Sequence, residues 1–520
     1  MKSFKKVILW ILSNKQISAI LCIAFLIYFI GSWWGLPYLY HPDEQDIIDI
    51  ALGFFSGDLN PHFFIQPTFP MYLIFTLLVP VSLIIFIMSK FRGNQAGGLY
   101  ELLLQEKYVF YFVGRLVNIL FSVGCVLLVY LITKRLTKNR DLSTLTAVIF
   151  SVLPVIVENS KYALNSMPLA FWVLVSFYFC LGISQSNDIR NYILAGFFAG
   201  LAASTKYFGL LVILPVVSAH LLKKSSKRQR LVSRKLVLAC LGFLGSFIMT
   251  SPFIFLDQTA IGSILVHFNH IKAEGHLGYD AMPAAYAYLQ YLLKDFGLIL
   301  FFACATAVVF LLFKRIGLVL LSYPLVFLLY ISTWKVYYPR YLISVVPFLI
   351  ISLAFMLNDI SGSRIIGLLR KNTKLYYLGT MILLIALLYH PVARAVLIES
   401  DFLKQDTRTI AKIWIENNIS PGSKIAYEFY CPQLDVVQKG NFTLFKEWQI
   451  VSKPLEFYVN ESVDYIILSS TFKYRFLNET KRYNVEVERY SQIEANSELV
   501  YEITANQSIV GPKIWVYRLK

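Results

Sequence analysis

Four acidic residues crowd the stretch "YLYHPDEQDIIDI", residues 38–50, directly after an apolar run that approaches the length of a membrane span. Asp43 and Glu44 follow a proline, which fixes the turn, and a half-buried carboxylate at such a point can act as a base. We therefore predict that Asp43 is a catalytic base and that Glu44 is a supporting acid that orients either the acceptor or the loop. The other acids of this loop are interpreted as ordinary loop charges, and they are Asp46, Asp49 and Asp58.

Two basic residues are the expected partners of an anionic substrate group. The apolar block 191–222 has basic residues at both flanks, so it must cross the membrane twice, yet two spans need about 40 residues. Its tip, "STKYFG", is therefore predicted to stop below the membrane surface, with Lys206 at membrane depth. Arg340 stands at the end of another apolar block, in "WKVYYPRYLISVVPFL". Two such cations suit a lipid phosphate, and the alternative is that both extend to lipid headgroups.

Further substrate-binding residues are predicted around these cations, and they are Gln66, Tyr341 and His41. A metal site is a separate hypothesis. His267 and His270 would share one helix face, but their loose spacing is equally typical of polar loop residues. No cofactor is predicted from a motif, and a divalent metal stays open.

The elements that must position these residues are membrane helices. Hydrophobic residues make up 57% of the 520 and charged residues only 15%, with a mean hydropathy of +0.60. An ordinary soluble domain carries about 25% charged residues. From Ser400 onward the 15 basic and 15 acidic residues balance, so the net charge of +17 lies in the first 399 residues. These basic residues cluster in short loops between apolar blocks, which indicates cytoplasmic loops of a membrane protein rather than a nucleic-acid-binding surface.

Eleven apolar blocks are predicted to form about eleven transmembrane helices, mainly α in class, with a cytoplasmic N-terminus and an extracytoplasmic C-terminus. The blocks are 17–37, 68–89, 108–132, 143–157, 167–184, 191–222 (two spans), 235–256, 296–313, 316–333, 341–357 and 375–392. The count holds only if 68–89 does not cross. If it crossed, every later basic loop would face outward, against the charge bias, so we predict that it lies along the membrane or dips into it.

The chain is predicted to divide into a transmembrane domain, 1–392, and a small exported α/β domain, 393–520. A helix is expected near Asp406–Asn418. Strands are expected at "PGSKIAYEF", "VDYIILSS", "YNVEVERY" and "IWVYRL". Cys431 is the one cysteine of this region, so no disulfide is expected there.

Several stretches resemble the GT-C membrane glycosyltransferases, in particular bacterial relatives of the dolichyl-phosphate-mannose protein mannosyltransferases and of the lipid A aminoarabinose transferase. These are "HPDEQDIIDIALGFFSGD", "QPTFPMYLI", "GRLVNILFSVGCVLLVYLITKRL", "SKYALNSMPLAFW", "AGFFAGLAASTKYFGLLVILPV", "YYPRYLISVVPFL" and "DTRTIAKIWIENNISPGSKIAYE". Their order along the chain matches the family over most of its length.

The resemblance implies an enzyme of the plasma (inner) membrane that moves a sugar from a polyprenyl-phosphate donor to an extracytoplasmic lipid, polysaccharide or protein, with inversion. It implies that Asp43 is the base and that juxtamembrane helices follow in the first outer loop. The sequence departs from many relatives at Gln66, where they carry Lys or His, and at Ser166, where they carry Asp. A phosphate or acceptor contact is therefore lost or moved at these positions.

Two other classes of protein remain open. One is a lipid or saccharide transporter or flippase, because a buried lysine and an intramembrane hairpin also occur in transporters. The other is a non-catalytic membrane scaffold whose exported domain binds a partner. The crowding of acids at one surface and the lack of a two-fold repeat favour the enzyme.

Overall fold

The computed structural model describes residues 13–91, 102–104, 106–186, 188–222, 233–278, 282–361, 373–435 and 441–520. Many of the basic residues that the charge bias relies on, at 2–6, 223–232 and 364–372, lie outside the described residues. The chain forms two compact units. The first unit contains Met1–Ser32, Asp43–Glu274 and Pro283–Glu399, and the second unit contains Trp33–Pro42, Gly275–Met282 and Ser400–Lys520.

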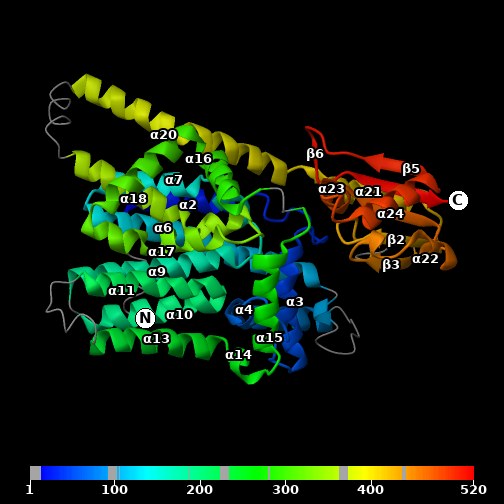
Figure 1. Ribbon diagram of the computed structural model, residues 1–520, viewed down its shortest axis with the longest axis horizontal. Helices are drawn as coiled ribbons and strands as arrows, with labels where there is room; N and C mark the ends of the chain where they lie inside the picture. Colours follow the sequence, from blue (N-terminus) through cyan, green and yellow to red (C-terminus); the bar gives the residue numbers. More distant parts are fainter. Residues whose placement is uncertain are drawn as a thin grey trace. The chain divides into compact units, whose positions relative to one another are not determined.

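The first unit is helical (Figure 1). Its α-helices are α2 (Lys15–Phe29), α3 (Gln45–Gly53), α4 (Phe69–Phe91), α6 (Lys107–Thr137), α7 (Arg140–Ser151), α8 (Pro154–Ser160), α9 (Ser166–Gln185), α10 (Ile189–Thr205), α11 (Ile213–Leu221), α13 (Arg234–Thr250), α14 (Phe253–Leu256), α15 (Ala260–Asn269), α16 (Ala284–Leu312), α17 (Arg315–Ile331), α18 (Val346–Ser361) and α20 (Thr373–Phe402). Short 3-10 helices are η1 (Pro42–Glu44), η2 (Phe54–Ser56), η3 (Tyr207–Val212) and η5 (Pro339–Ser344), and η4 (His270–Glu274) is a π-helical turn.

Several of these helices are long and apolar enough to cross a bilayer. Among the described residues five qualify by length and composition, and the bent pair α7–α8, with an angle of 61°, would make a sixth. Four further apolar helical segments have 10–17 residues. A multi-pass membrane chain is thus confirmed, while the count of eleven spans stays a prediction.

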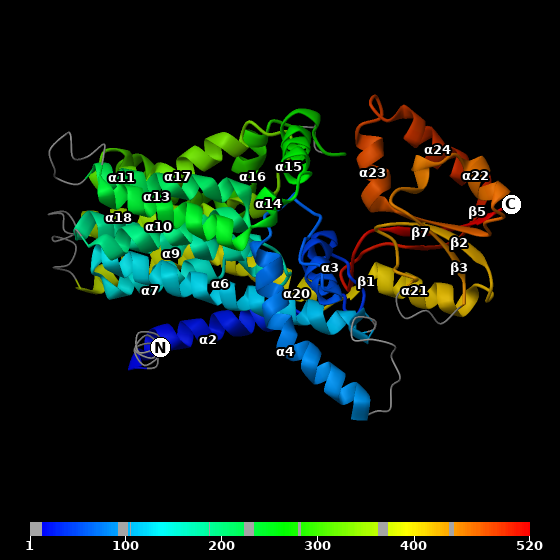
Figure 2. The same ribbon diagram turned by 90° about the horizontal axis from the view of Figure 1, so that it is seen from below.

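Helix α4 differs from the long helices around it. It runs obliquely to the parallel helices α9, α10 and α13 (Figures 1 and 2) and packs on α3. Its exposed side chains are almost all apolar, and they include Leu77, Val79, Leu83, Ile84, Phe86, Ile87 and Met88. Such a surface suits lipid. Helix α4 is one of the five helices that are long and apolar enough to cross a bilayer, so the expectation that residues 68–89 do not cross stays a prediction.

The second unit is built on a five-stranded sheet of order β3-β2-β4-β7-β5. Its strands are β2 (Lys424–Glu428), β3 (Thr443–Glu447), β4 (Tyr465–Ser469), β5 (Ser497–Ile503) and β7 (Ile514–Leu519). Strand β2 is parallel to both neighbours, while β7 is antiparallel to β4 and β5. A separate parallel pair joins β1 (Gln405–Asp406) to β6 (Ile509–Val510).

Helices cover both faces of this sheet (Figure 2). On one face lies α21 (Thr407–Asn418), and on the other lie α22 (Leu455–Asn460), α23 (Ser470–Asn478) and α24 (Asn484–Ala495). Each face has its own apolar core: Ala411 and Ile415 of α21 pack on one side, and Phe472 and Tyr490 on the other.

One predicted strand of this unit is wrong. Residues 483–490, "YNVEVERY", alternate valine and glutamate in the manner of a strand, but they form the start of α24. The buried residues Tyr490 and Ile493 are three positions apart and contact the core together with Val487. This spacing is helical, and burial at helical spacing outweighed the local alternation.

Candidate active site

The acids of the first loop are gathered at one end of the helical bundle. Residues Pro42–Glu44 form the turn η1, which leads directly into α3, and Figure 2 shows α3 near the ends of α9, α10 and α13. Asp43 and Asp46 are three residues apart on this helical stretch, and their charges interact. The turn and the helix thus present two carboxyl groups to one region.

Asp43 forms an ion pair with Arg340. Both side chains are partly open, with 30% of the Asp43 side chain and 21% of the Arg340 side chain exposed. Arg340 comes from η5, and its guanidinium lies 4.5 Å from the ring centre of Tyr338. The predicted base and one predicted phosphate-binding cation therefore meet directly, although 297 positions separate them in the chain.

Glu44 has a different environment. Its side chain is fully buried, and both carboxylate oxygens accept hydrogen bonds from Arg115 of α6, at 2.8 and 2.7 Å. The backbone N–H of Ala163 donates to the same carboxylate at 2.8 Å, and Arg115 also donates to the carbonyl of Ser32 at 2.8 Å. These contacts tie the turn at η1 to α6 and to the chain near residues 32 and 163.

Two further acids of this stretch are also held by the protein. Burial raises the pKa of Asp46 to about 6; the Asp43 and Asp49 carboxylates add to this rise, while Arg340 opposes it. Asp49 accepts hydrogen bonds from Lys107 and Tyr111, both at 2.6 Å. Asp46 thus belongs to the Asp43–Arg340 region, a placement that the sequence analysis missed although the spacing of three residues was a signal for it.

Lys206 lies in the break between α10 and η3, at the tip of the predicted hairpin. Its ammonium donates to the Ser166 hydroxyl at 3.0 Å and lies 5.6 Å from the ring centre of Tyr341. The charges of Asp43 and Arg340 both act on it. Lys206, Arg340 and Asp43 therefore share one electrostatic neighbourhood, with Tyr341 beside Lys206.

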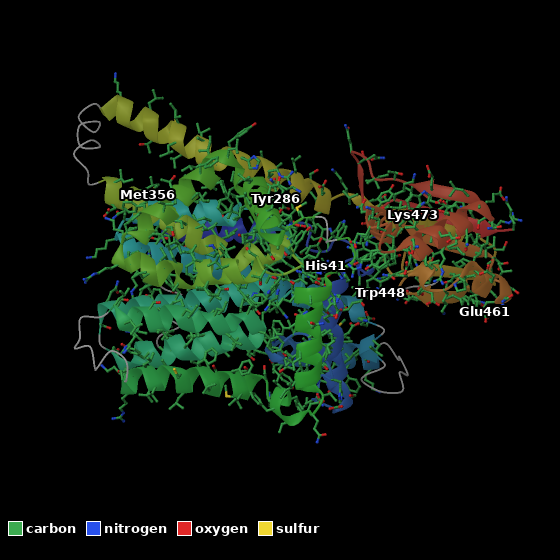
Figure 3. The ribbon with its side chains drawn as sticks, in the orientation of Figure 1. His41, Tyr286, Met356, Trp448, Glu461 and Lys473 are labelled. Carbon is green, nitrogen blue, oxygen red and sulfur yellow. The ribbon has the colours of Figure 1, made fainter. Side chains whose placement is uncertain are left out.

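Gln66 joins this part of the first unit through its amide. Its oxygen accepts a hydrogen bond of 2.5 Å from Asn165, the residue before Ser166. His41, labelled in Figure 3, belongs to segment Trp33–Pro42 of the second unit, so the site of the first unit is described without it.

The metal hypothesis finds no support in the described residues, which contain no group of three or more His, Cys, Asp and Glu able to hold an ion. His270 contacts Glu274 at 3.2 Å. His267 packs near Phe268, and burial lowers its pKa to about 4. His267 and His270 therefore lack the third ligand that a metal site would need among the described residues.

A small apolar cavity of about 20 Å³ lies beside these residues within the first unit. Four of its lining residues directly adjoin site residues in the chain, and they are Ile47, Gly114, Asn165 and Thr205. Phe69 and Trp172 contribute aromatic walls. A cluster of charged groups therefore adjoins apolar side chains.

The sequence analysis also missed Arg115 and Asn165, which hold Glu44 and Gln66. Arg115 lies inside a long apolar helix, and a buried arginine there requires a carboxylate partner. That requirement was a readable signal. Asn165 offered none.

Residues 82–271 match the family described as dolichyl-phosphate-mannose-protein mannosyltransferase. No curated protein matches the chain. The crystal structure of ArnT from Cupriavidus metallidurans bound to undecaprenyl phosphate aligns with a TM-score of 0.52 at 13% identity, over 96% of this chain and 97% of ArnT.

The archaeal oligosaccharyltransferase AglB from Archaeoglobus fulgidus, in complex with an inhibitory peptide and a dolichol-phosphate, aligns with a TM-score of 0.54 at 12% identity. The alignment covers 97% of this chain and 74% of AglB. At such identities the likeness shows the fold, and the family match over residues 82–271 indicates a glycosyltransferase. The predicted resemblance is thereby confirmed: the chain is a membrane glycosyltransferase with the GT-C fold.

Proposed function

We propose that the enzyme moves a sugar from a polyprenyl-phosphate donor to an extracytoplasmic acceptor in a single inverting displacement. The observation that carries this proposal is the meeting of Asp43, Arg340 and Lys206, one base and two cations, beside an apolar cavity. The neighbours ArnT and AglB were solved with undecaprenyl phosphate and a dolichol-phosphate, which supports the same donor class here.

The two cations are proposed to bind the donor phosphate. Lys206 contacts a neutral hydroxyl, that of Ser166, rather than an acid at that position, so its charge remains available to an anion. Arg340 offers several donors in one plane, which suits phosphate oxygens. As the bond between sugar and phosphate breaks, negative charge grows on the leaving group, and fixed cations stabilise that charge more than water would.

Asp43 is proposed to take the proton of the acceptor. The acceptor oxygen or nitrogen attacks the anomeric carbon, and the electrons of the broken carbon–oxygen bond stay on the polyprenyl phosphate. Arg340 pairs with Asp43 in the structure. A phosphate that draws Arg340 toward itself would weaken this pair and leave the carboxylate free to accept the proton.

Glu44 is proposed to position the turn rather than the acceptor. Its two oxygens are occupied by Arg115 and by the N–H of Ala163. The role of Gln66 is proposed as a contact to donor or acceptor, oriented by Asn165. The apolar side chains around the small cavity are proposed to contact the isoprenoid chain next to the phosphate, because Ile47 and Thr205 lie within one residue of Asp46 and Lys206.

The proposed topology places this site and the second unit on the extracytoplasmic side of the plasma membrane. It is supported by the charge bias of the loops and by the oblique course of α4. A reporter that is active only outside the cytoplasm, fused after Lys520, should be active. An inactive reporter on a membrane-inserted protein contradicts the topology.

The function is tested by incubating the purified protein with polyprenyl-phosphate sugars labelled in the sugar. Release of free labelled sugar or its transfer to an added acceptor is the expected result. Movement of the intact donor across a vesicle membrane without cleavage would show a transporter instead, and neither cleavage nor movement would leave a scaffold.

A further inference from the structure

The second unit carries a cluster of aromatic side chains where its parallel strands end. We call it the aromatic platform, and it consists of Phe429, Tyr430, Trp448 and Phe472. The ring centres of Phe429 and Trp448 are 4.3 Å apart, those of Tyr430 and Phe472 are 4.8 Å apart, and those of Trp448 and Phe472 are 5.9 Å apart. All four residues follow the carboxyl ends of β2, β3 and β4 within a few positions.

This place in the fold is where ligands bind in open α/β sheets. The chain leaves β2 toward β3 on one side, and leaves β4 toward β5 and β7 on the other. The connections therefore diverge between β2 and β4, which creates a crevice outside the carboxyl ends of these strands. Phe429 and Tyr430 come from one side of this crevice, and Phe472 from the other.

The rings of the platform differ in their exposure to solvent. Phe472 is only 2% exposed, whereas Trp448 is 57% exposed. The N–H of Phe429 donates to the carbonyl of Trp448 at 3.4 Å. In Figure 3, Trp448 and Glu461 lie at opposite ends of the second unit, and Glu461 accepts from Lys424 at the start of β2. A large, largely exposed ring thus lies at one end of the sheet, while Leu277 of segment Gly275–Met282 packs into the apolar core beside Phe472.

Charged groups of both signs border the platform. Arg475 lies 5.4 Å from the ring centre of Tyr430. Glu447, the residue before Trp448, pairs with Lys453 at 2.5 Å. Such groups can both donate hydrogen bonds to hydroxyl groups and accept hydrogen bonds from them, and the mixed signs disfavour a strongly charged ligand of either sign.

We infer that the aromatic platform binds a sugar ring of a neutral glycan. A pyranose has one face of C–H groups and a rim of hydroxyl groups. The C–H face would lie on the indole of Trp448, whose ring face is electron-rich, and the hydroxyl groups would reach Glu447, Lys453 and Arg475. The inference rests on the proposed function in one respect: the bound glycan would be the acceptor or part of it.

Binding can be measured without donor or turnover. The full chain in phosphatidylcholine nanodiscs is mixed with mannotriose, maltotriose, cellotriose or chitotriose, and saturation-transfer NMR detects contact with the sugar protons. At least one oligosaccharide should show transfer, strongest at the C–H protons of one ring face. Trp448→Ala should weaken its binding at least about tenfold, and Trp448→Phe by less.

A matched control is available on the opposite face of the sheet. Trp414 of α21 stacks on Tyr501 with ring centres 4.4 Å apart, so Trp414→Ala removes a tryptophan of the same unit away from the platform. It should bind the oligosaccharide as the parent does. Asp43→Asn, which stops transfer under the proposed function, should also bind normally, so failure of the enzyme mechanism and failure of this site are distinguishable.

Two results would overturn the inference. One is the absence of saturation transfer from all four oligosaccharides, or equal binding by the parent and Trp448→Ala. The other is quenching of the parent's fluorescence by brominated lipid that Trp448→Ala removes, without sugar binding. That result would make Trp448 an anchor in the membrane interface instead.

Discussion

Two neighbouring carboxylates of the first unit, Asp43 and Glu44, both pair with an arginine, and the two pairs differ in almost every other respect. Glu44 and Arg115 have side chains that are 0% and 2% exposed, and every oxygen of the carboxylate is used. Asp43 and Arg340 are each at least one-fifth exposed. A buried pair that is fully hydrogen-bonded fixes a backbone turn, whereas an open pair can exchange partners with a substrate.

The largest stability effect is expected at the buried pair. Glu44→Gln or Arg115→Met leaves one charge buried without its partner, which typically costs about 3–5 kcal/mol in the free energy of unfolding. Asp43→Asn should cost less than about 1 kcal/mol, because its pair is partly solvated. Thermal unfolding of the detergent-solubilised variants measures both. Equal destabilisation by Asp43→Asn and Glu44→Gln would contradict the claim that only the Glu44 pair holds the fold.

The next effect concerns the cations near Asp43. Lys206→Gln and Arg340→Gln each remove one positive charge from the proposed phosphate site, and the loss of such a contact commonly raises the barrier by roughly 3–4 kcal/mol. Turnover and donor affinity should fall while the unfolding midpoint stays near that of the parent. Lys314→Gln is a matched control, since Lys314 pairs with Asp359 in an exposed contact. Normal turnover of Lys206→Gln or Arg340→Gln at saturating donor would remove that residue from the site.

A smaller effect is expected at Asp46, the acidic neighbour of the proposed base. Its substitution shows which of the two carboxylates accepts the proton. Burial holds the pKa of Asp46 at about 6, so it could also accept a proton near neutral pH. Because Arg340 pairs with Asp43 and not with Asp46, we expect Asp46→Asn to lower turnover by no more than about tenfold, or 1.4 kcal/mol. Initial rates at pH 7.5 measure it. A loss equal to that of Asp43→Asn would assign the base to Asp46.

The smallest effect compares Glu44 with Glu428 of the second unit, a buried acid whose hydrogen-bond donors are neutral. Glu428 accepts from the N–H of Ser469 at 2.8 Å and from Tyr490 at 3.2 Å. Burial raises its pKa to about 8. The folded chain therefore keeps its proton where the unfolded chain loses it, so this contribution to stability is complete below about pH 4.5 and is lost as pH rises to 8.

Glu428→Gln removes that titration and should flatten the decline of the unfolding midpoint between pH 5 and pH 8.5. The parent and the variant are compared by thermal unfolding at each pH. Parallel curves for the two proteins would show that Glu428 is already ionised in the folded chain.

The comparison also separates what the sequence could reveal from what it could not. The crowding of acids after an apolar run identified Asp43, and the length of the block 191–222 placed Lys206 at a helix break, because both depend on local spacing. The position of Arg115 in an apolar helix signals that it needs a carboxylate, but no local pattern shows that this partner is Glu44, 71 positions away. In the second unit β3 and β5, which were not predicted from the sequence, are the two edge strands of the sheet.

The most direct test of the proposed mechanism is the single-turnover rate of Asp43→Asn with a labelled polyprenyl-phosphate sugar and a saturating acceptor. The substitution keeps the shape of the side chain and removes its basicity. We expect donor binding to persist and the transfer rate to fall by about 10²–10⁴. A folded Asp43→Asn protein that transfers sugar at nearly the parent rate would contradict the assignment of Asp43 as the base.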